Sequence, residues 1–245
     1  AIASVFLSAV KADQLNLNGA GITVAVVDSG IAYHNDFKVS GSTNQYRIIA
    51  NDYFSGSGGS DDLYGHGTHV AGIVGGNGSM SNGTNQGVAP GVNLINLKVT
   101  DRDGMTYESY VVNSLQWVYN NKDAYNIRVV NISLNSTVAQ SYHTSPLSAA
   151  VEILWFNGIV VVVSAGNNGT ADGPSTVYPP ANDPFVITVG ATEDKGTAGL
   201  ADDTMAVFSA YNTTEDGFAK PEIVAPGRNI VAPLAEKAST IYIAH

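Results

Sequence analysis

The sequence predicts an α/β fold: a three-layer sandwich in which a mostly parallel central sheet is flanked by helices. Two observations support this prediction. Short apolar runs alternate along the chain with amphipathic stretches, and no internal repeat interrupts that alternation. Strands that alternate with helices favour parallel pairing through right-handed crossovers, with helices over both faces of the sheet. Catalytic side chains are then expected at the carboxyl ends of the strands.

Five short apolar runs are interpreted as buried strands. They are Ile22 to Val27, Asn93 to Val99, Arg128 to Ile132, Ile159 to Ser164 and Val186 to Val189.

Two stretches have helical periodicity. Tyr107 to Asn120 places Tyr107, Val111, Leu115 and Val118 on one face, and Pro146 to Asn157 does the same with Leu147, Ala150, Val151 and Leu154. Three turn-rich stretches are interpreted as surface loops, namely Phe54 to Asp62, Gly75 to Gly87 and Asn167 to Pro174.

The composition is that of a globular protein, and we expect a single catalytic domain over residues 1–245. The apolar fraction is 44%, the charged fraction is 13%, and 11 basic against 21 acidic side chains give a net charge of −10. No apolar run approaches the roughly 18 residues that a membrane helix needs. An acidic chain offers no basic surface to phosphates or anionic lipids, so we expect neither nucleic acid nor membrane as a partner. The absence of cysteine excludes disulfides and a cysteine nucleophile.

The first motif that carries chemistry is Val24 to Gly30, VAVVDSG. Four apolar residues bring Asp28 to the end of a strand, and the small Ser29 and Gly30 allow a sharp exit. A carboxylate in this position can accept a hydrogen bond from a histidine ring. Taken alone, the motif fits a turn or helix-cap aspartate equally well.

The second motif is Tyr64 to Val74, YGHGTHVAGIV, in which glycines flank His66 and small residues suited to a packed helix follow. His66 and His69 are three residues apart, so both could ligate one metal on a helix. The zinc-protease pattern needs four-residue spacing and a glutamate, which this stretch lacks. We therefore interpret His69 as a packed structural histidine.

The third motif is Val160 to Gly169, VVVVSAGNNG, a buried strand that ends in Ser164-Ala165-Gly166 and then presents Asn167. An amide at such an edge can donate to an oxygen that gains negative charge during acyl transfer. Without the other two motifs, it would be read as an ordinary turn.

Together, the order and spacing of these motifs resemble the subtilisin-type serine proteases of the subtilase family from about Gly21 to Pro233. The stretches Asn126 to Leu134 and Ala219 to Gly227 further resemble the AprX-like bacterial subtilases. The resemblance implies a serine endopeptidase with Asp28 as the triad acid, His66 as the general base and Asn167 as the oxyanion-hole donor.

The same resemblance implies where an extended polypeptide substrate binds. Gly104, Met105 and Thr106, and Ser133, Leu134 and Asn135, match the two segments that clasp the peptide as an added strand. Ser164, Ala165 and Gly166 match one wall of the S1 pocket. Asn135 departs from the glycine that usually follows Ser-Leu in the family, so the preference for the residue at P1 is left open.

The family's nucleophile lies in a Gly-Thr-Ser-Met-Ala motif downstream of a segment like Ala225-Pro226-Gly227, and the chain has no such motif. Ser239 lacks the glycine and the small apolar followers of a nucleophile. We expect a chain that is incomplete at its C-terminus, by truncation, autolysis or nicking, and that is inactive alone. Its own C-terminal fragment and its propeptide are then expected partners.

No cofactor is expected for the chemistry, and the resemblance leaves a structural calcium ion as one option. Asp36 matches an acidic position that often binds calcium in the family, and the loop Gly75 to Gly87 falls where ligating carbonyls are found. That loop carries no acidic residue, and hard cations need several oxygens. The acidic composition suits a secreted enzyme, so we expect an extracellular location. A cytoplasmic location is the alternative, because AprX-like subtilases are not all exported.

Three other readings stay open. The chain could be an inactive subtilase-like protein that binds peptides without cutting, although a binder has no chemical need of both Asp28 and His66. A nucleotide-binding protein would need a phosphate-cradling turn after the first strand, and Asp-Ser-Gly-Ile-Ala is not one. A metal hydrolase would use Asp28, His66 and His69.

Overall fold

The computed structural model describes residues 5–55, 59–235 and 240–241. The chain divides into two compact units. The first holds Ala1–Leu15 and Ile132–Ile230, and the second holds Asn16–Asn131 and Val231–His245. The α-helices are α1 (Phe6–Ala9), α2 (His66–Gly75), α3 (Glu108–Asn121) and α4 (Pro146–Phe156). The strands are β1 (Thr23–Asp28), β2 (Ile48–Tyr53), β3 (Asn93–Lys98), β4 (Ile127–Ile132), β5 (Val160–Ser164), β6 (Ile187–Glu193), β7 (Thr204–Met205), β8 (Asn212–Thr213), β9 (Ala219–Lys220) and β10 (Ile223–Pro226).

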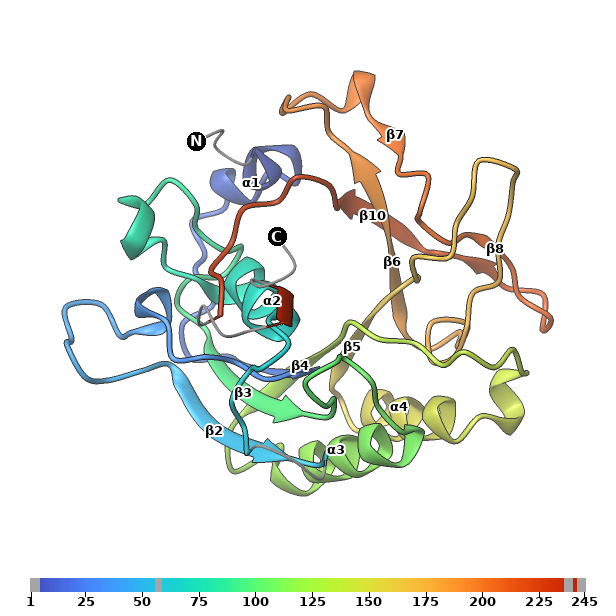
Figure 1. Cartoon of the computed structure of the whole chain (residues 1–245), viewed down its shortest axis with the longest axis horizontal. Coiled ribbons are helices and arrows are strands. Elements are labelled where there is room, and N and C mark those ends of the chain that lie inside the picture. Colours follow the sequence, from blue (N-terminus) through green and yellow to red (C-terminus); the bar gives the residue numbers. More distant parts are fainter. Residues whose placement is uncertain (1–4, 56–58, 236–239, 242–245) are drawn as a thin grey trace. The chain divides into compact units, whose positions relative to one another are not determined.

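The second unit is built on strands in the order β4-β1-β3-β2. β1 pairs with β3 in parallel from Thr23 opposite Asn93 to Asp28 opposite Lys98, and β2 pairs with β3 in parallel on its other side. Figure 1 shows α2 and α3 on opposite sides of these strands, and both helices contact β1. All six residues of β1 are buried, as expected for a strand covered on both faces.

The core of the second unit lies between β1 and α2. It contains Val24 and Val26 of β1 together with six residues from neighbouring elements: Ile31, Phe37, Ile48, Ala71, Val92 and Leu94. Removing this apolar surface from water stabilises the unit and holds the carboxyl end of β1 against the start of α2.

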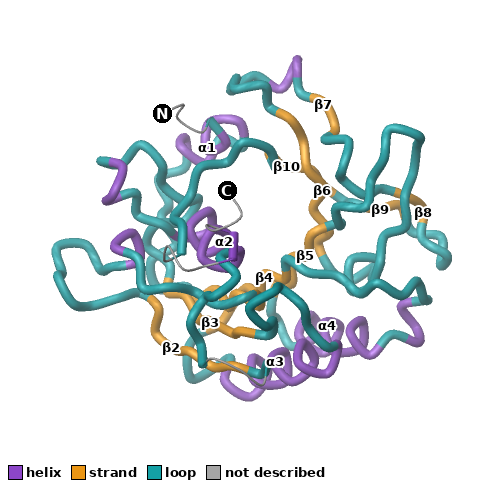
Figure 2. Tube along the Cα trace, in the orientation of Figure 1, coloured by secondary structure: helices purple, strands orange, loops and turns teal. Residues whose placement is uncertain are grey.

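The first unit holds the strands β10-β6-β5, all parallel, with the short β7 antiparallel to β6 and a separate β8-β9 pair. α4 packs on β5, with Leu147, Val151 and Leu154 buried. Figure 2 shows that much of this unit is loop, which connects short strands.

The α/β fold with a mostly parallel sheet is confirmed, and the five predicted strands and two predicted helices are present. Their ends agree within two residues except in β6, which continues to Glu193, four residues beyond the predicted end at Val189. β2 and β10 were not predicted. β2 has only three apolar residues before Asn51 and Asp52 and is exposed at alternate positions, whereas β10 ends in a proline and has two exposed and two half-buried residues. Tyr107 was predicted on the buried face of a helix and is 70% exposed, because α3 begins one residue later and Tyr107 is its extended N-cap. Among the described residues, no helix is long and apolar enough to cross a membrane.

Candidate active site

Asp28 is the last residue of β1, and the chain turns away from the sheet directly after it. The Ser29 N–H donates to Asp28 Oδ1 at 2.7 Å, which holds one carboxylate oxygen in place. Gly30 has a φ of 122°, and a Cβ there would come within 2.8 Å of the Asp62 backbone. Glycine is therefore needed for the turn that leaves the Asp28 carboxylate at the strand end.

His66 is the first residue of α2 and faces Asp28. Its Nδ1 lies 2.8 Å and 3.0 Å from the two carboxylate oxygens of Asp28. Since a carboxylate only accepts, Nδ1 donates and Nε2 is the nitrogen left for chemistry. The approach is close because Gly67 has no side chain, and a Cβ there would collide with the Gly30 carbonyl oxygen. The His66 side chain is 42% exposed, so the ring remains open to solvent on one side.

The protonation of His66 reflects two opposed influences. Burial lowers the pKa of His66, while the hydrogen bond to Asp28 and the negative charges of Asp28 and Asp62 raise it. The net result is a pKa above the ordinary histidine value. The site thus stabilises the imidazolium that forms when His66 takes a proton.

Asp62 is a buried carboxylate that ties the start of α2 to the strand end. Its Oδ1 accepts from the Gly65 N–H at 2.7 Å and from Ser29 Oγ at 2.8 Å. Its Oδ2 accepts from the Thr68 N–H at 2.8 Å and from Thr68 Oγ1 at 2.6 Å. Ser29 Oγ in turn accepts from the Gly67 N–H at 2.8 Å. A helix leaves the backbone N–H groups at its start unpaired, and here those of Gly65, Gly67 and Thr68 have side-chain acceptors.

Asp62 was not among the residues predicted from the sequence. The available signal was an acidic residue four positions before the helix start, in Asp-Leu-Tyr-Gly-His, because carboxylates favour helix N-termini. That signal was not distinctive within a loop that also contains Asp61.

The predicted substrate segment at Gly104, Met105 and Thr106 lies beside the approach to His66. Gly104 has a φ of 79°, and a Cβ there would lie 2.8 Å from the ring of Tyr64. Thr106 Oγ1 donates to the Val99 carbonyl at 2.7 Å, which fixes the segment to the end of β3. Met105 is 68% exposed. The structure therefore places this segment against Tyr64, two residues before His66, within the second unit.

Thr240 and Ile241 also join this region, which the sequence did not indicate. Their N–H groups donate to the carbonyls of Leu63 at 2.8 Å and Tyr64 at 2.9 Å. Thr240 Oγ1 donates to the Arg102 carbonyl at 2.8 Å. These two residues thus link the stretch before His66 to the stretch before Gly104.

The predicted amide donor, Asn167, belongs to the first unit and is exposed just past the end of β5. The turn that carries it is held on both sides by the stretch before β8. Gly166 O accepts from the Ala210 N–H at 3.0 Å, and the Gly169 N–H donates to Phe208 O at 2.8 Å. Gly166 has a φ of 108°, which favours glycine. The backbone is therefore built to present the Asn167 side chain outward.

The first unit also joins the predicted segments Ser133 to Asn135 and Ser164 to Gly166. Asn135 Nδ2 donates to the Ser164 carbonyl at 3.0 Å. Leu134 and Ser133 are half-buried, and Ala165 is buried. The two proposed sides of the substrate-binding region are therefore in direct contact through one side chain.

The loop Gly75 to Gly87 is organised by a guanidinium. Arg47 is buried and donates to the carbonyls of Asp36 at 2.8 Å, Gly75 at 2.6 Å and Val92 at 2.8 Å. Asp36 Oδ1 accepts from Ser79 Oγ at 3.0 Å and from the Met80 N–H at 2.8 Å.

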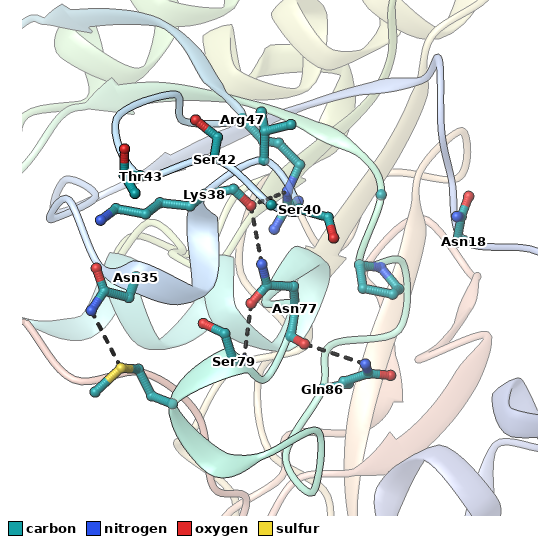
Figure 3. A pocket seen from close by; sticks show the side chains of 15 residues that line it. Asn18, Asn35, Lys38, Ser40, Ser42, Thr43, Arg47, Asn77, Ser79 and Gln86 are labelled. Atoms are coloured by element: carbon teal, nitrogen blue, oxygen red, sulfur yellow. Dashed lines mark hydrogen bonds between the residues drawn. The ribbon is translucent and has the colours of Figure 1, made fainter.

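A cavity of about 680 Å³ opens beside this loop, and Figure 3 shows Asn77 and Gln86 bonded within its wall. The carbonyls of Asp36 and Gly75 already face the positive charge of Arg47, and the loop adds no carboxylate.

The remaining sequence predictions concern whether His69 is a metal ligand and whether Ser239 is a nucleophile. His69 is half-buried on α2. Among the described residues, no group of three or more histidine, aspartate or glutamate side chains is arranged to hold a metal. Ser239 lies outside the described residues.

Known proteins resemble this chain over most of its length. The sequence profile of the subtilase family, Peptidase_S8, matches residues 19–245. Serine protease AprX of Bacillus subtilis (strain 168) is 38% identical over 223 residues, covering 88% of this chain and 48% of that protein. Subtilisin DY of Bacillus licheniformis is 33% identical over 226 residues, covering 90% of this chain and 71% of that protein. Against AprX, the chain thus spans about half the length of its relative.

Two solved structures share the fold. Sphericase matches with a TM-score of 0.76 at 23% identity, covering 100% of this chain and 82% of that one. A cold-adapted subtilisin-like serine proteinase matches with a TM-score of 0.66 at 28% identity, covering 94% of this chain and 74% of that one.

Proposed function

The chain belongs to the subtilase family, and from that premise we propose that it forms the catalytic framework of a serine endopeptidase that cleaves extended polypeptides. The observation that carries the proposal is the contact of His66 Nδ1 with both oxygens of Asp28, 2.8 Å and 3.0 Å away. A general base needs a ring held in one tautomer with its second nitrogen accessible. This contact fixes the tautomer, and the exposed side of the ring leaves Nε2 accessible.

In the proposed mechanism His66 Nε2 takes the proton of a serine hydroxyl as that oxygen attacks the peptide carbonyl. Asp28 holds the ring in orientation and stabilises the imidazolium. The exposed amide of Asn167 donates to the oxyanion of the tetrahedral intermediate. His66 then returns the proton to the leaving amine. Because His66 acts as a base only when neutral, the rate rises with pH through a pKa above the ordinary histidine value.

The serine itself is assigned to polypeptide other than these 245 residues, which contain no Gly-Thr-Ser-Met-Ala run. Either a longer product of the same gene or a companion fragment would supply it. The 245-residue chain alone is then expected to leave peptides uncut. Intact-mass analysis of purified material separates the two sources, because a nicked protein shows a second species beside 25.5 kDa.

The proposed partners are an extended polypeptide, which pairs with the segments at Gly104 to Thr106 and Ser133 to Asn135, and the protein's own propeptide and C-terminal fragment. No cofactor takes part in the proposed chemistry, and Arg47 is proposed to do the bridging that a calcium ion would do at Asp36. The acidic charge balance supports an extracellular location, which fractionation of expressing cells tests.

The experiment compares casein hydrolysis by the complete gene product with that of His66→Ala and Asp28→Asn. Each substitution is expected to lower kcat by at least about a thousandfold. His143→Ala is the matched control, because His143 is an exposed histidine of the other unit and its loss should leave the rate unchanged. A serine-directed phosphonate should abolish activity, whereas a chelator should not. A folded, inactive gene product that binds peptides would refute the enzyme and favour the peptide-binding protein.

A further inference from the structure

On the proposed function Ser164 to Gly166 forms one wall of the S1 pocket. The Asn135 side chain contacts this wall from the peptide-binding segment Ser133 to Asn135, which thereby becomes the second wall. Its Nδ2 donates to the Ser164 carbonyl at 3.0 Å, and its Oδ1 lies 3.5 Å from Ser164 Oγ. Ser133 to Asn135 directly follows β4, and Ser164 to Gly166 begins at the last residue of β5. The amide therefore occupies the space between the two backbones instead of extending into solvent.

Both walls are fixed by backbone hydrogen bonds, so the bridge joins two rigid segments. Directly after Asn135, the Ser136 N–H donates to the Pro179 carbonyl at 2.7 Å. On the other wall, the Ala165 N–H donates to the Val189 carbonyl at 2.9 Å. Neither wall can move apart to admit a bulky side chain without breaking contacts within its unit.

The space beside Gly166 is also occupied by amide oxygens. A Cβ at Gly166 would lie 3.0 Å from Asn168 Oδ1 and 3.5 Å from Asn135 Oδ1. The space beside Gly166 is therefore small, and amide oxygens line it. Polar atoms already paired with protein lose those partners when a large apolar group displaces them.

We infer that Asn135 determines specificity at P1, the residue on the amino side of the cleaved bond, and restricts it to small side chains such as glycine, alanine and serine. A phenylalanine or leucine at P1 would have to expel the Asn135 side chain and leave the Ser164 carbonyl without its donor. A glycine at position 135 would remove both the bulk and the bridge. This inference rests on the proposed function, since it assigns the substrate class of that same site.

The experiment measures kcat/KM of the complete gene product on peptides that differ only at P1. We expect the unaltered protein to prefer alanine over phenylalanine and leucine. Asn135→Gly should raise kcat/KM for phenylalanine and leucine by at least about tenfold, the range that contacts in an apolar pocket usually provide, and change the alanine substrate little. Asn135→Asp has almost the same size but cannot donate to a carbonyl. If kcat/KM for the phenylalanine and leucine substrates also rises in this variant, the hydrogen bond to Ser164 closes the pocket in addition to the bulk of the side chain.

Asn126→Gly is the matched control. Asn126 also donates its amide to a backbone carbonyl, that of Gly21 at 2.7 Å, and its φ of 50° suits glycine. Its loss should leave the P1 profile unchanged. The inference is overturned if the unaltered protein cleaves after phenylalanine as well as after alanine, or if folded Asn135→Gly and Asn135→Asp keep the original profile. A gene product that hydrolyses neither casein nor any peptide would instead refute the proposed function, and this inference with it.

Discussion

Replacement of Asp62 tests whether its buried carboxylate positions Asp28 and His66, the proposed acid and base. It accepts four hydrogen bonds, two on each oxygen, from Gly65, Ser29 and Thr68. Asp62→Asn keeps one oxygen and turns an NH₂ group toward the donors of the other. One backbone N–H and one hydroxyl then lose their acceptor, and each unsatisfied buried donor costs about 1–3 kcal/mol. Since the hydroxyl can rotate toward another partner, we expect a loss of about 2–4 kcal/mol in the free energy of unfolding.

The same substitution should change the titration of His66. The negative charge of Asp62 is one of the influences that raise the pKa of His66, so its removal should lower that pKa. NMR titration of the His66 ring and urea denaturation, both done on the 245-residue chain, measure the two effects. The sign follows from linkage: a raised histidine pKa stabilises the fold at pH below the ordinary value, and this stabilisation is lost as the pH rises through the folded value.

Asp61→Asn is the matched control, because it removes the same charge from the neighbouring exposed residue. It should change stability by less than about 0.5 kcal/mol. The reasoning is refuted if Asp62→Asn and Asp61→Asn have the same stability and the same His66 titration.

Three further substitutions test contacts elsewhere in the fold. Arg47→Met removes one donor from each of three backbone carbonyls, of which that of Asp36 keeps the Asn77 N–H, and should lower the free energy of unfolding by about 2–4 kcal/mol. A chelator should leave the Tm of the unaltered chain unchanged, and a chelator-induced drop would refute the assignment of Arg47 as the bridge. Gly67→Ala drives a methyl group into the Gly30 carbonyl and should destabilise by about 3 kcal/mol or more in thermal denaturation, while Gly199→Ala, in open space, should have little effect. Burial raises the pKa of Asp183 to about 6, so stability should fall as the pH rises from about 4 to about 6 and then level off; urea titrations of Asp183→Asn should lack this slope.

Local pattern was sufficient to predict the strands that carry the site. β1 and β5 are nearly continuous apolar runs, and Asp28 and Asn167 were found because each follows such a run. β3 was predicted from the shorter apolar pattern of Leu94, Ile95 and Leu97. The start of α2 was recognisable because the glycines beside His66 are adjacent to it in sequence. These features depend on residues that are neighbours along the chain. For such residues, the hydrophobic period and the local composition are enough to predict the secondary structure.

Contacts between distant residues were not predictable in the same way. Asp62 looked like one of two loop acids, and only packing shows that its carboxylate, unlike that of exposed Asp61, lies among the donors of α2. Arg47 carried no motif, and its role depends on carbonyls from three other stretches. Asn135 stood out in the sequence as a departure from glycine, but its bond to the Ser164 carbonyl, 29 residues away, could not be inferred from it.

The sequence by itself therefore determined the α/β class, the order of the strands along the chain and the identity of the acid, base and amide that the family resemblance assigns. Tertiary structure alone decided which donors meet which acceptors: the tautomer of His66, the network on Asp62, the guanidinium bridge of Arg47 and the amide bridge of Asn135. The physical reason is that hydrophobic periodicity is a property of a local segment. A hydrogen bond instead requires two groups, often distant in sequence, to be placed to within a few tenths of an ångström, and only the packed core does this.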